Sequence, residues 1–134
     1  MTTDSGTPDE LLYAPSHEWL RRGDQNPGEA TIGITDFAQD QLGDVVYVDL
    51  PATGTTVEAG ESCGEIESTK TVAELYAPVA GEVVDVNDEL SDAPELVNES
   101  PYGEGWLIRL RIADDADLAN LLDAAGYQAQ LAAE

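Results

Sequence analysis

The chain has few basic residues and very little histidine or cysteine. Five Lys and Arg residues stand against 28 Asp and Glu, for a formal net charge of −23, and there is one histidine and one cysteine. A single cysteine, Cys63, excludes an internal disulfide and is typical of a reducing compartment. Nucleic-acid binding is not expected, because phosphate contacts require cationic side chains.

The sequence also lacks long apolar runs. None approaches the roughly 20 residues that a helix needs to span a bilayer, so no membrane partner is expected. Residues 1–10 are polar and acidic, without the basic start and apolar centre of a secretion signal. We therefore predict a disordered acidic leader at 1–10, a single domain at 11–134 and a cytoplasmic location.

The acidic residues are spread along the whole chain and are not gathered in one tail. Self-repulsion of this size weakens a compact state in dilute buffer, and molar salt screens it. The even distribution favours a protein adapted to a salt-rich cytoplasm. An acidic partner for a basic surface is the alternative.

Short strand patterns bounded by glycine and proline dominate the chain. Strands are predicted at residues 17–20, 30–34, 45–50, 63–67, 72–77, 82–86 and 106–112. The run 45–50 is the strongest of these, because it is rich in β-branched and aromatic residues. The fold class is therefore predicted to be mainly β with minor α.

Helical patterns are few. A helix is predicted at 36–42, with Asp36 as its cap and Gly43 as its stop. A single helical turn is expected near 94–98. The tail predicts a C-terminal helix at 115–125 that ends at Gly126, because its leucines share one helical face.

A weak internal repeat flanks the centre of the chain. Residues 43–48 (GDVVYV) resemble residues 81–86 (GEVVDV). Two similar halves suggest a β-sandwich with approximate two-fold symmetry, and chance similarity of two strands is the alternative.

Lys70 is the only lysine and lies between two strand patterns. A hairpin joining Ile66 to Val72 is expected to leave Ser68, Thr69 and Lys70 exposed at its tip. An amine at an exposed tip is suited to acylation by a modifying enzyme, whereas Schiff-base chemistry needs a desolvated amine. An ordinary surface lysine is the alternative.

Several runs, in the same order from about residue 12 to the C-terminus, resemble the H proteins of the glycine cleavage system. They are 13–19 (YAPSHEW), 32–39 (IGITDFAQ), 42–48 (LGDVVYV), 67–70 (ESTK), 77–84 (APVAGEVV) and 101–108 (PYGEGWLI). The run 67–70 is similar to the family's lipoylation site. The resemblance implies a lipoyl-domain-like barrel-sandwich hybrid with a C-terminal helical segment.

The resemblance further implies a carrier without a catalytic site, in which Lys70 bears lipoic acid in amide linkage. The arm would take an aminomethyl group from the pyridoxal-phosphate glycine decarboxylase (P protein) to the aminomethyltransferase (T protein). The arm would then present the dithiol to dihydrolipoyl dehydrogenase (L protein) for reoxidation. A lipoate-attaching enzyme would attach the lipoic acid to Lys70. Because the arm is tethered to the protein, the carried group would be present at a high effective concentration.

Family members are thought to shelter the loaded arm in a polar cleft. In register with the family, Glu18, Gln41 and Glu74 are the candidates here. A carboxylate such as Glu18 would pair with the ammonium of the carried group. Other members can have histidine at the position of Gln41 and aspartate at that of Glu74.

Other functions remain as alternatives. A biotin carrier domain usually has methionine on both sides of its lysine, where this chain has Thr69 and Thr71. A lipoyl domain of a 2-oxo acid dehydrogenase would be followed by a linker and a catalytic domain. An H-like protein that relays lipoyl groups to other enzymes stays open. A hydrolase would rest only on Cys63 and His17, without an orienting third group.

Overall fold

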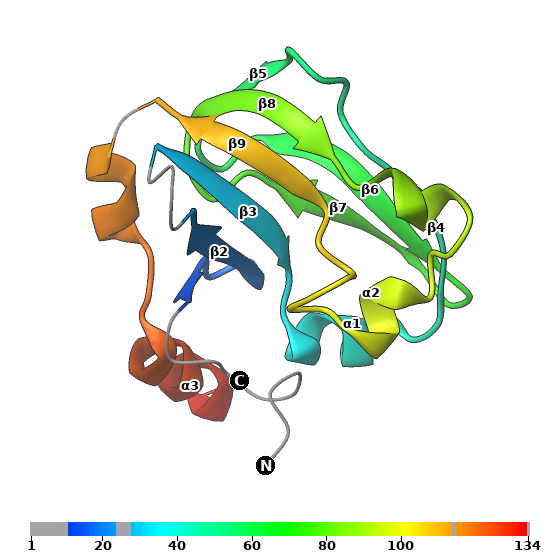
Figure 1. Cartoon of the computed structure of the whole chain (residues 1–134). Helices are drawn as coiled ribbons and strands as arrows, with labels where there is room; N and C mark the ends of the chain where they lie inside the picture. Colours follow the sequence, from blue (N-terminus) through cyan, green and yellow to red (C-terminus); the bar gives the residue numbers. More distant parts are fainter. Residues whose placement is uncertain (1–10, 24–27, 114, 134) are drawn as a thin grey trace.

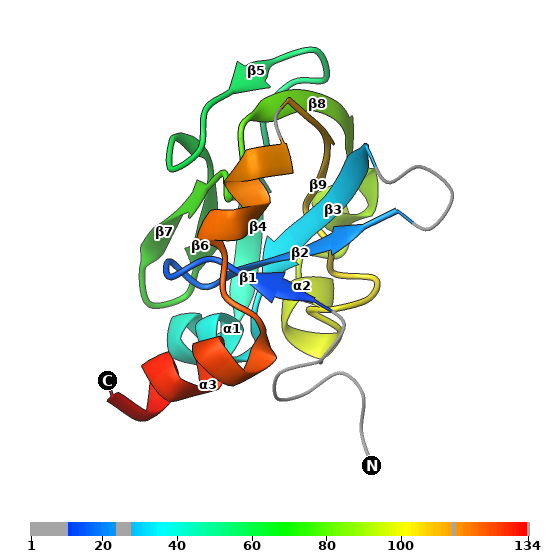
Figure 2. The ribbon, with the colours of Figure 1, turned by 90° about the vertical axis from the view of Figure 1, so that its left-hand side faces the viewer.

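The computed structural model describes residues 11–23, 28–113 and 115–133. Two antiparallel sheets face each other, and the α-helices gather at one end (Figures 1 and 2). The six-stranded sheet has the order β1-β2-β3-β9-β8-β5, with β1 Leu12–Tyr13, β2 Glu18–Arg22, β3 Glu29–Ile34, β9 Ile108–Ile112, β8 Gly81–Val86 and β5 Thr56–Val57. The three-stranded sheet has the order β4-β6-β7, with β4 Val45–Asp49, β6 Ser62–Ser68 and β7 Val72–Tyr76. The α-helices are α1 Asp36–Leu42, α2 Leu96–Glu99 and α3 Ala124–Ala133, and the 3-10 helices are η1 Asp88–Ser91 and η2 Asp115–Asn120.

The mainly β fold is as predicted, and each predicted strand overlaps an observed one. The strand predicted at 17–20 begins one residue later, at Glu18, because His17 has a φ of 78°. Strands β1 and β5 were not predicted, since two residues are too few to give an alternating pattern. The predicted leader at 1–10 and the turn residues 24–27 lie outside the described residues.

Helix α1 has the predicted bounds but a different cap. Thr35 is the N-cap, and its side chain accepts a hydrogen bond from the Ala38 amide. Asp36 is instead the first helical residue, where a carboxylate favours the positive end of the helix dipole. Gly43 ends the helix with a φ of 83°, a backbone conformation that glycine adopts without strain.

The predicted C-terminal helical segment is present, but its predicted bounds were wrong. Residues 115–120 form the 3-10 helix η2, and α3 begins only at Ala124. Gly126 lies inside α3 and does not end it. Tyr127 explains the difference, because its ring is fully buried and stacks on Tyr13 of β1 at 4.7 Å between ring centroids.

The main core fills the space between the two sheets. Ile66 and Leu75 point inward from the three-stranded sheet, and Ile32, Val83 and Leu110 from the other, with at most 1% of each exposed. Burial of side chains of this size contributes about 1.5–3 kcal/mol each. A second cluster contains Trp19 and anchors α3; its buried members are Leu11, Tyr13, Trp19, Tyr102, Ala124 and Tyr127. The tip of the β6–β7 hairpin is thereby held on a packed base.

The internal sequence repeat corresponds to equivalent strands. Strand β4 pairs with β6 and β8 pairs with β9, both antiparallel. Each pairing has a β-bulge at the same place, between Val45 and Tyr47 in β4 and between Val83 and Asp85 in β8. The two halves therefore share local geometry as well as sequence.

Candidate functional site

Lys70 lies at the tip of the β6–β7 hairpin, with its side chain exposed. The expectation that Ser68 is exposed there was wrong, because Ser68 belongs to β6 and is 7% exposed. Its hydroxyl accepts hydrogen bonds from the amides of Lys70 (3.2 Å) and Thr71 (3.1 Å), and its own amide donates to the Thr71 carbonyl at 2.8 Å. The serine side chain thus organises the turn that presents the lysine.

The tip is also attached to the loop that follows α1. The Thr69 amide donates to the Asp44 carbonyl at 3.0 Å. The aliphatic stem of Lys70 passes directly over Gly43, where a Cβ would lie 2.9 Å from Lys70 Cε. Gly43 therefore ends α1 at the point where the lysine stem passes.

Asn98 of α2 holds this loop in place, a role that the sequence did not reveal. Its amide nitrogen donates to the Gly43 carbonyl (2.8 Å) and to Gln39 Oε1 (3.0 Å). Its oxygen accepts from the Val45 amide at 2.8 Å. Three hydrogen bonds from one side chain fix the platform on which Lys70 rests.

A cleft of about 370 Å³ lies between the hairpin and α1. It is lined by Ser16, His17, Glu18, Ile34, Phe37, Ala38, Gln41, Leu42, Ile66, Thr71, Ala73 and Glu74. The three candidate residues Glu18, Gln41 and Glu74 therefore lie in one cavity. Thr71, the neighbour of Lys70, is part of the same lining.

Glu18 is the unusual group of this cleft, because it is only 2% exposed. Burial raises the pKa of its carboxyl to about 7, although the Ser16 hydroxyl and the Tyr76 amide donate to it. Gln41 of α1 and Glu74 of β7 are exposed. The cleft thus combines an apolar floor with one buried acid that changes charge near neutral pH.

Tyr127 of α3 fixes the wall of the cleft next to Glu18. Its hydroxyl lies 2.7 Å from His17 Nδ1 and 2.8 Å from Thr35 Oγ1. The Thr35 amide in turn donates to the His17 carbonyl at 3.0 Å. These contacts hold His17 in its left-handed conformation. No local sequence pattern predicts them, because Tyr127 is 110 residues away from His17.

The remaining candidate groups are Cys63 and His17. Burial and the nearby Glu18 and Glu61 carboxylates raise the pKa of Cys63 to about 11, so its reactive thiolate is disfavoured. His17 is engaged with Tyr127. Within the described ranges, no group of three or more His, Cys, Asp and Glu side chains is arranged to hold a metal ion. Every helix of that part is also too short or too polar to cross a bilayer.

The chain is similar to known proteins over nearly its whole length. The family model described as "Glycine cleavage H-protein" matches residues 11–134. The glycine cleavage system H protein of Cronobacter sakazakii is 54% identical over 127 residues, which cover 95% of this chain and 97% of that protein. The H protein of Marinobacter nauticus is 48% identical over 130 residues, 97% of this chain and 98% of the relative. The crystal structure of a Mycobacterium marinum H protein superposes with a TM-score of 0.85 at 41% identity, covering 93% of this chain and 98% of that one.

Proposed function

Because the chain belongs to the glycine cleavage H-protein family, whose members are non-catalytic lipoyl carriers, we propose that Lys70 is its lipoyl attachment site. The protein is a shuttle of the glycine cleavage system and not an enzyme. The single observation that carries the assignment is the solitary, exposed Lys70 on a hydrogen-bonded hairpin tip. Lipoic acid supplies a disulfide that accepts and releases the carried group.

The protein works with the other components of the system, the P, T and L proteins. We propose that the tip meets them in turn: it takes the aminomethyl group at the decarboxylase, delivers it at the aminomethyltransferase and is reoxidised at the dehydrogenase. A lipoate-attaching enzyme is a fourth partner at the same lysine. The rigid base at Gly43 and Asn98 supports this role, because it restricts movement to the arm itself.

The cleft residues Glu18, Gln41 and Glu74 are proposed to shelter the carried group between these visits. The ammonium of an aminomethyl group would pair with the Glu18 carboxylate, and the apolar floor would exclude water. The buried position of Glu18 supports this role, since an ion pair is stronger away from solvent. Pairing with a cation would also lower the pKa of the Glu18 carboxyl and favour its charged form.

We propose that residues 11–134 act as one carrier domain in a cytoplasm, the compartment that a lone cysteine suits. The charge of −23 supports adaptation of the protein to salt.

Intact-mass analysis of protein isolated from its native cell tests the attachment site. We expect one lipoyl-sized adduct that maps to Lys70 and is lost in Lys70→Arg. A biotin-sized adduct, or none, would contradict the assignment. Glycine–bicarbonate exchange reconstituted with the decarboxylase then separates a glycine cleavage carrier, which supports exchange, from a protein that only relays lipoyl groups, which does not.

A further inference from the structure

The two copies of the internal repeat are supported differently where their strands begin. In the second copy, the short strand β5 lies beside the start of β8, and the Val83 amide donates to the Thr55 carbonyl at 2.8 Å. Val45 is the equivalent residue of the first copy, and its amide donates instead to Oδ1 of Asn98 at 2.8 Å. A single side chain of α2 therefore takes the place that a backbone carbonyl has in the other half.

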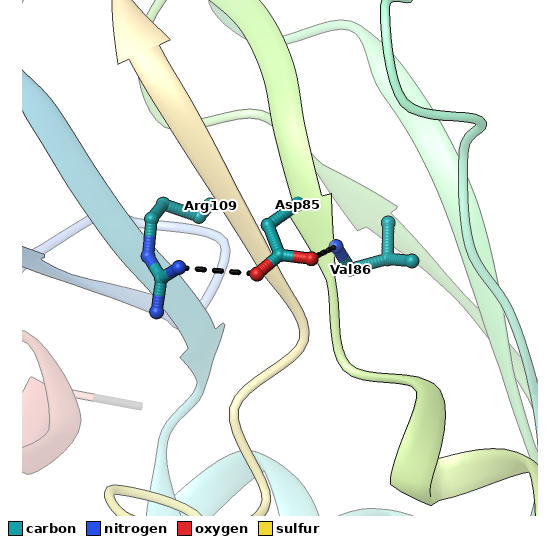
Figure 3. Close-up of polar contacts among 3 residues, drawn as sticks. All are labelled: Asp85, Val86 and Arg109. Carbon is teal, nitrogen blue, oxygen red and sulfur yellow. Dashed lines mark hydrogen bonds and ion pairs between the residues drawn. The ribbon is translucent and has the colours of Figure 1, made fainter.

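The second copy has a further connection at its bulge. Figure 3 shows Asp85, which accepts a hydrogen bond from the following backbone amide at 2.9 Å and forms an ion pair with Arg109 of β9 at 3.1 Å. Tyr47 and Glu67 occupy the corresponding positions of the β4–β6 pair. A phenol and a carboxylate cannot form that ion pair, so the start of β4 relies on Asn98.

The side-chain amide of Asn98 has one favourable orientation. Its nitrogen donates to two oxygen atoms, the Gly43 carbonyl at 2.8 Å and Gln39 Oε1 at 3.0 Å, while its oxygen faces the Val45 N–H. Gln39 is itself oriented, because its amide nitrogen donates to Asp36 Oδ1 at 3.0 Å. A reversed Asn98 amide would place oxygen against two oxygens and nitrogen against an N–H. The loop that follows α1 is therefore held in one position relative to α2.

Helix α2 is a firm point from which to hold this loop. Val97, the residue before Asn98, is fully buried in the main core, and α1 and α2 lie side by side (Figure 1). At the other end of the connection, the Asp44 carbonyl accepts from the Thr69 amide at 3.0 Å. The support of the hairpin tip thus runs from the core through α2, the Asn98 side chain and residues 43–45.

We propose that Asn98 is a positioning residue for the acylation of Lys70. This proposal rests on the proposed function, because it concerns the attachment of the lipoyl group to the same lysine. In that reaction the Lys70 ammonium loses a proton, and the free amine attacks the carbonyl carbon of a lipoyl adenylate held by the lipoate-attaching enzyme. The amide bond forms, the bond between the carbonyl and the phosphate breaks, AMP leaves with the electron pair, and the nitrogen loses a second proton.

Position governs the rate of this reaction, because the amine must reach a carbonyl group that belongs to the site of another protein. A misplacement of about 1 Å can lower a rate about a hundredfold. The Lys70 stem crosses the end of α1 at Gly43, where a Cβ would lie 2.9 Å from Lys70 Cε, so movement of the loop displaces the stem as well as the tip. Asn98 therefore acts on the amine through the loop and not by contact with the reacting atoms.

The test compares lipoylation of the apoprotein and of its Asn98→Ala variant by a lipoate-attaching enzyme supplied with lipoate and ATP. Initial rates of adduct formation on Lys70 are followed by intact mass over a range of carrier concentrations. We expect kcat to fall about tenfold or more with little change in KM, because the exposed surface around the lysine is kept and only its placement is lost. Protection of the Val45 and Thr69 amides from hydrogen exchange should fall in the same variant.

Asn87→Ala is the matched control. Asn87 also makes three side-chain hydrogen bonds: it donates to the Glu104 and Trp106 carbonyls, each at 2.8 Å, and accepts from the Glu89 amide at 3.2 Å. These partners belong neither to the loop that follows α1 nor to the hairpin tip. The free energy of unfolding should fall as in the first variant, whereas kcat should equal the wild-type value.

Asn98→Asp is a second variant that keeps the shape of the side chain. A carboxylate still accepts from the Val45 amide, but it has no hydrogen to donate to the Gly43 carbonyl or to Gln39. Its kcat should therefore fall as well. This variant decides the question if Asn98→Ala does not fold.

The possible results separate the two proposals. A wild-type apoprotein that takes no lipoyl group on Lys70 would overturn the proposed function and the role of Asn98 together. A modified wild type with an unchanged kcat in the Asn98 variants would overturn the role of Asn98 alone. So would an equal fall of kcat in Asn87→Ala, which indicates a general loss of stability, or a rise of KM alone, which indicates that the enzyme contacts Asn98 directly.

Discussion

At the scale of single residues, Glu18 shows how burial prepares a group for function. Its carboxyl has a pKa of about 7 because burial outweighs the two hydrogen bonds that favour its ionised form. It is therefore protonated in mildly acidic solution and ionised in mildly alkaline solution. Only the ionised form can pair with an ammonium, so the proposed shelter should strengthen as the pH rises through 7.

Glu18→Gln tests this, because glutamine has the same shape but stays neutral. We expect the aminomethyl-loaded variant to lose its group roughly tenfold faster than the wild type at pH 8, the effect of losing one charge-assisted hydrogen bond. At pH 6 the two rates should be similar. The measurement is release of the one-carbon unit from isolated loaded protein, with Glu95→Gln, an exposed carboxylate before α2, as control. A ratio of the two rates that is the same at pH 6 and pH 8 would contradict the role of Glu18.

At the scale of elements, α1 and the longer strands could be predicted because the sequence patterns that define them are local. β-Branched runs such as 45–50 and the glycine at 43 act within a few positions. The end of α3 was misread because Gly126 costs only about 1 kcal/mol inside a helix. Packing of Tyr127 on Tyr13 outweighs that cost, and contacts so distant in sequence leave no local pattern.

The candidate site likewise contains residues that the sequence predicts and features that depend on contacts distant in sequence. Lys70 could be predicted from composition and motif, and Glu18, Gln41 and Glu74 from register with the family. Nothing local distinguishes the buried Glu18 from a solvated carboxylate, since its burial depends on β7 lying beside it. Ser68 was misjudged for a related reason: a serine at a turn satisfies backbone amides and so becomes buried.

Tyr127→Phe tests whether α3 stabilises the wall of the cleft. The change removes one hydroxyl and leaves His17 Nδ1 and Thr35 Oγ1 without that partner. The free energy of unfolding should fall by about 1–3 kcal/mol, the net contribution of two hydrogen bonds at about 0.5–1.5 kcal/mol each. Urea denaturation measures it. Tyr76→Phe, at a ring that is 36% exposed, should change the free energy by less than about 0.5 kcal/mol. Equal stability of Tyr127→Phe and the wild type would contradict the role of α3.

At the scale of the whole molecule, the charge of −23 acts on the stability of the folded state. Repulsion among carboxylates destabilises the folded state, and salt relieves it.

The whole-molecule prediction is that potassium chloride stabilises the fold. The free energy of unfolding, measured with urea because urea adds no ions, should rise steeply as salt shortens the Debye length from about 10 Å at 0.1 M to about 3 Å at 1 M. A steep rise at low salt indicates screening of charge, whereas a gradual rise continuing at molar salt indicates general strengthening of apolar burial. A free energy that stays constant from dilute buffer to molar potassium chloride would contradict adaptation to salt. The ion pairs Arg109–Asp85 and Arg111–Glu82 do not reverse the expected sign, since both are exposed and contribute little in water.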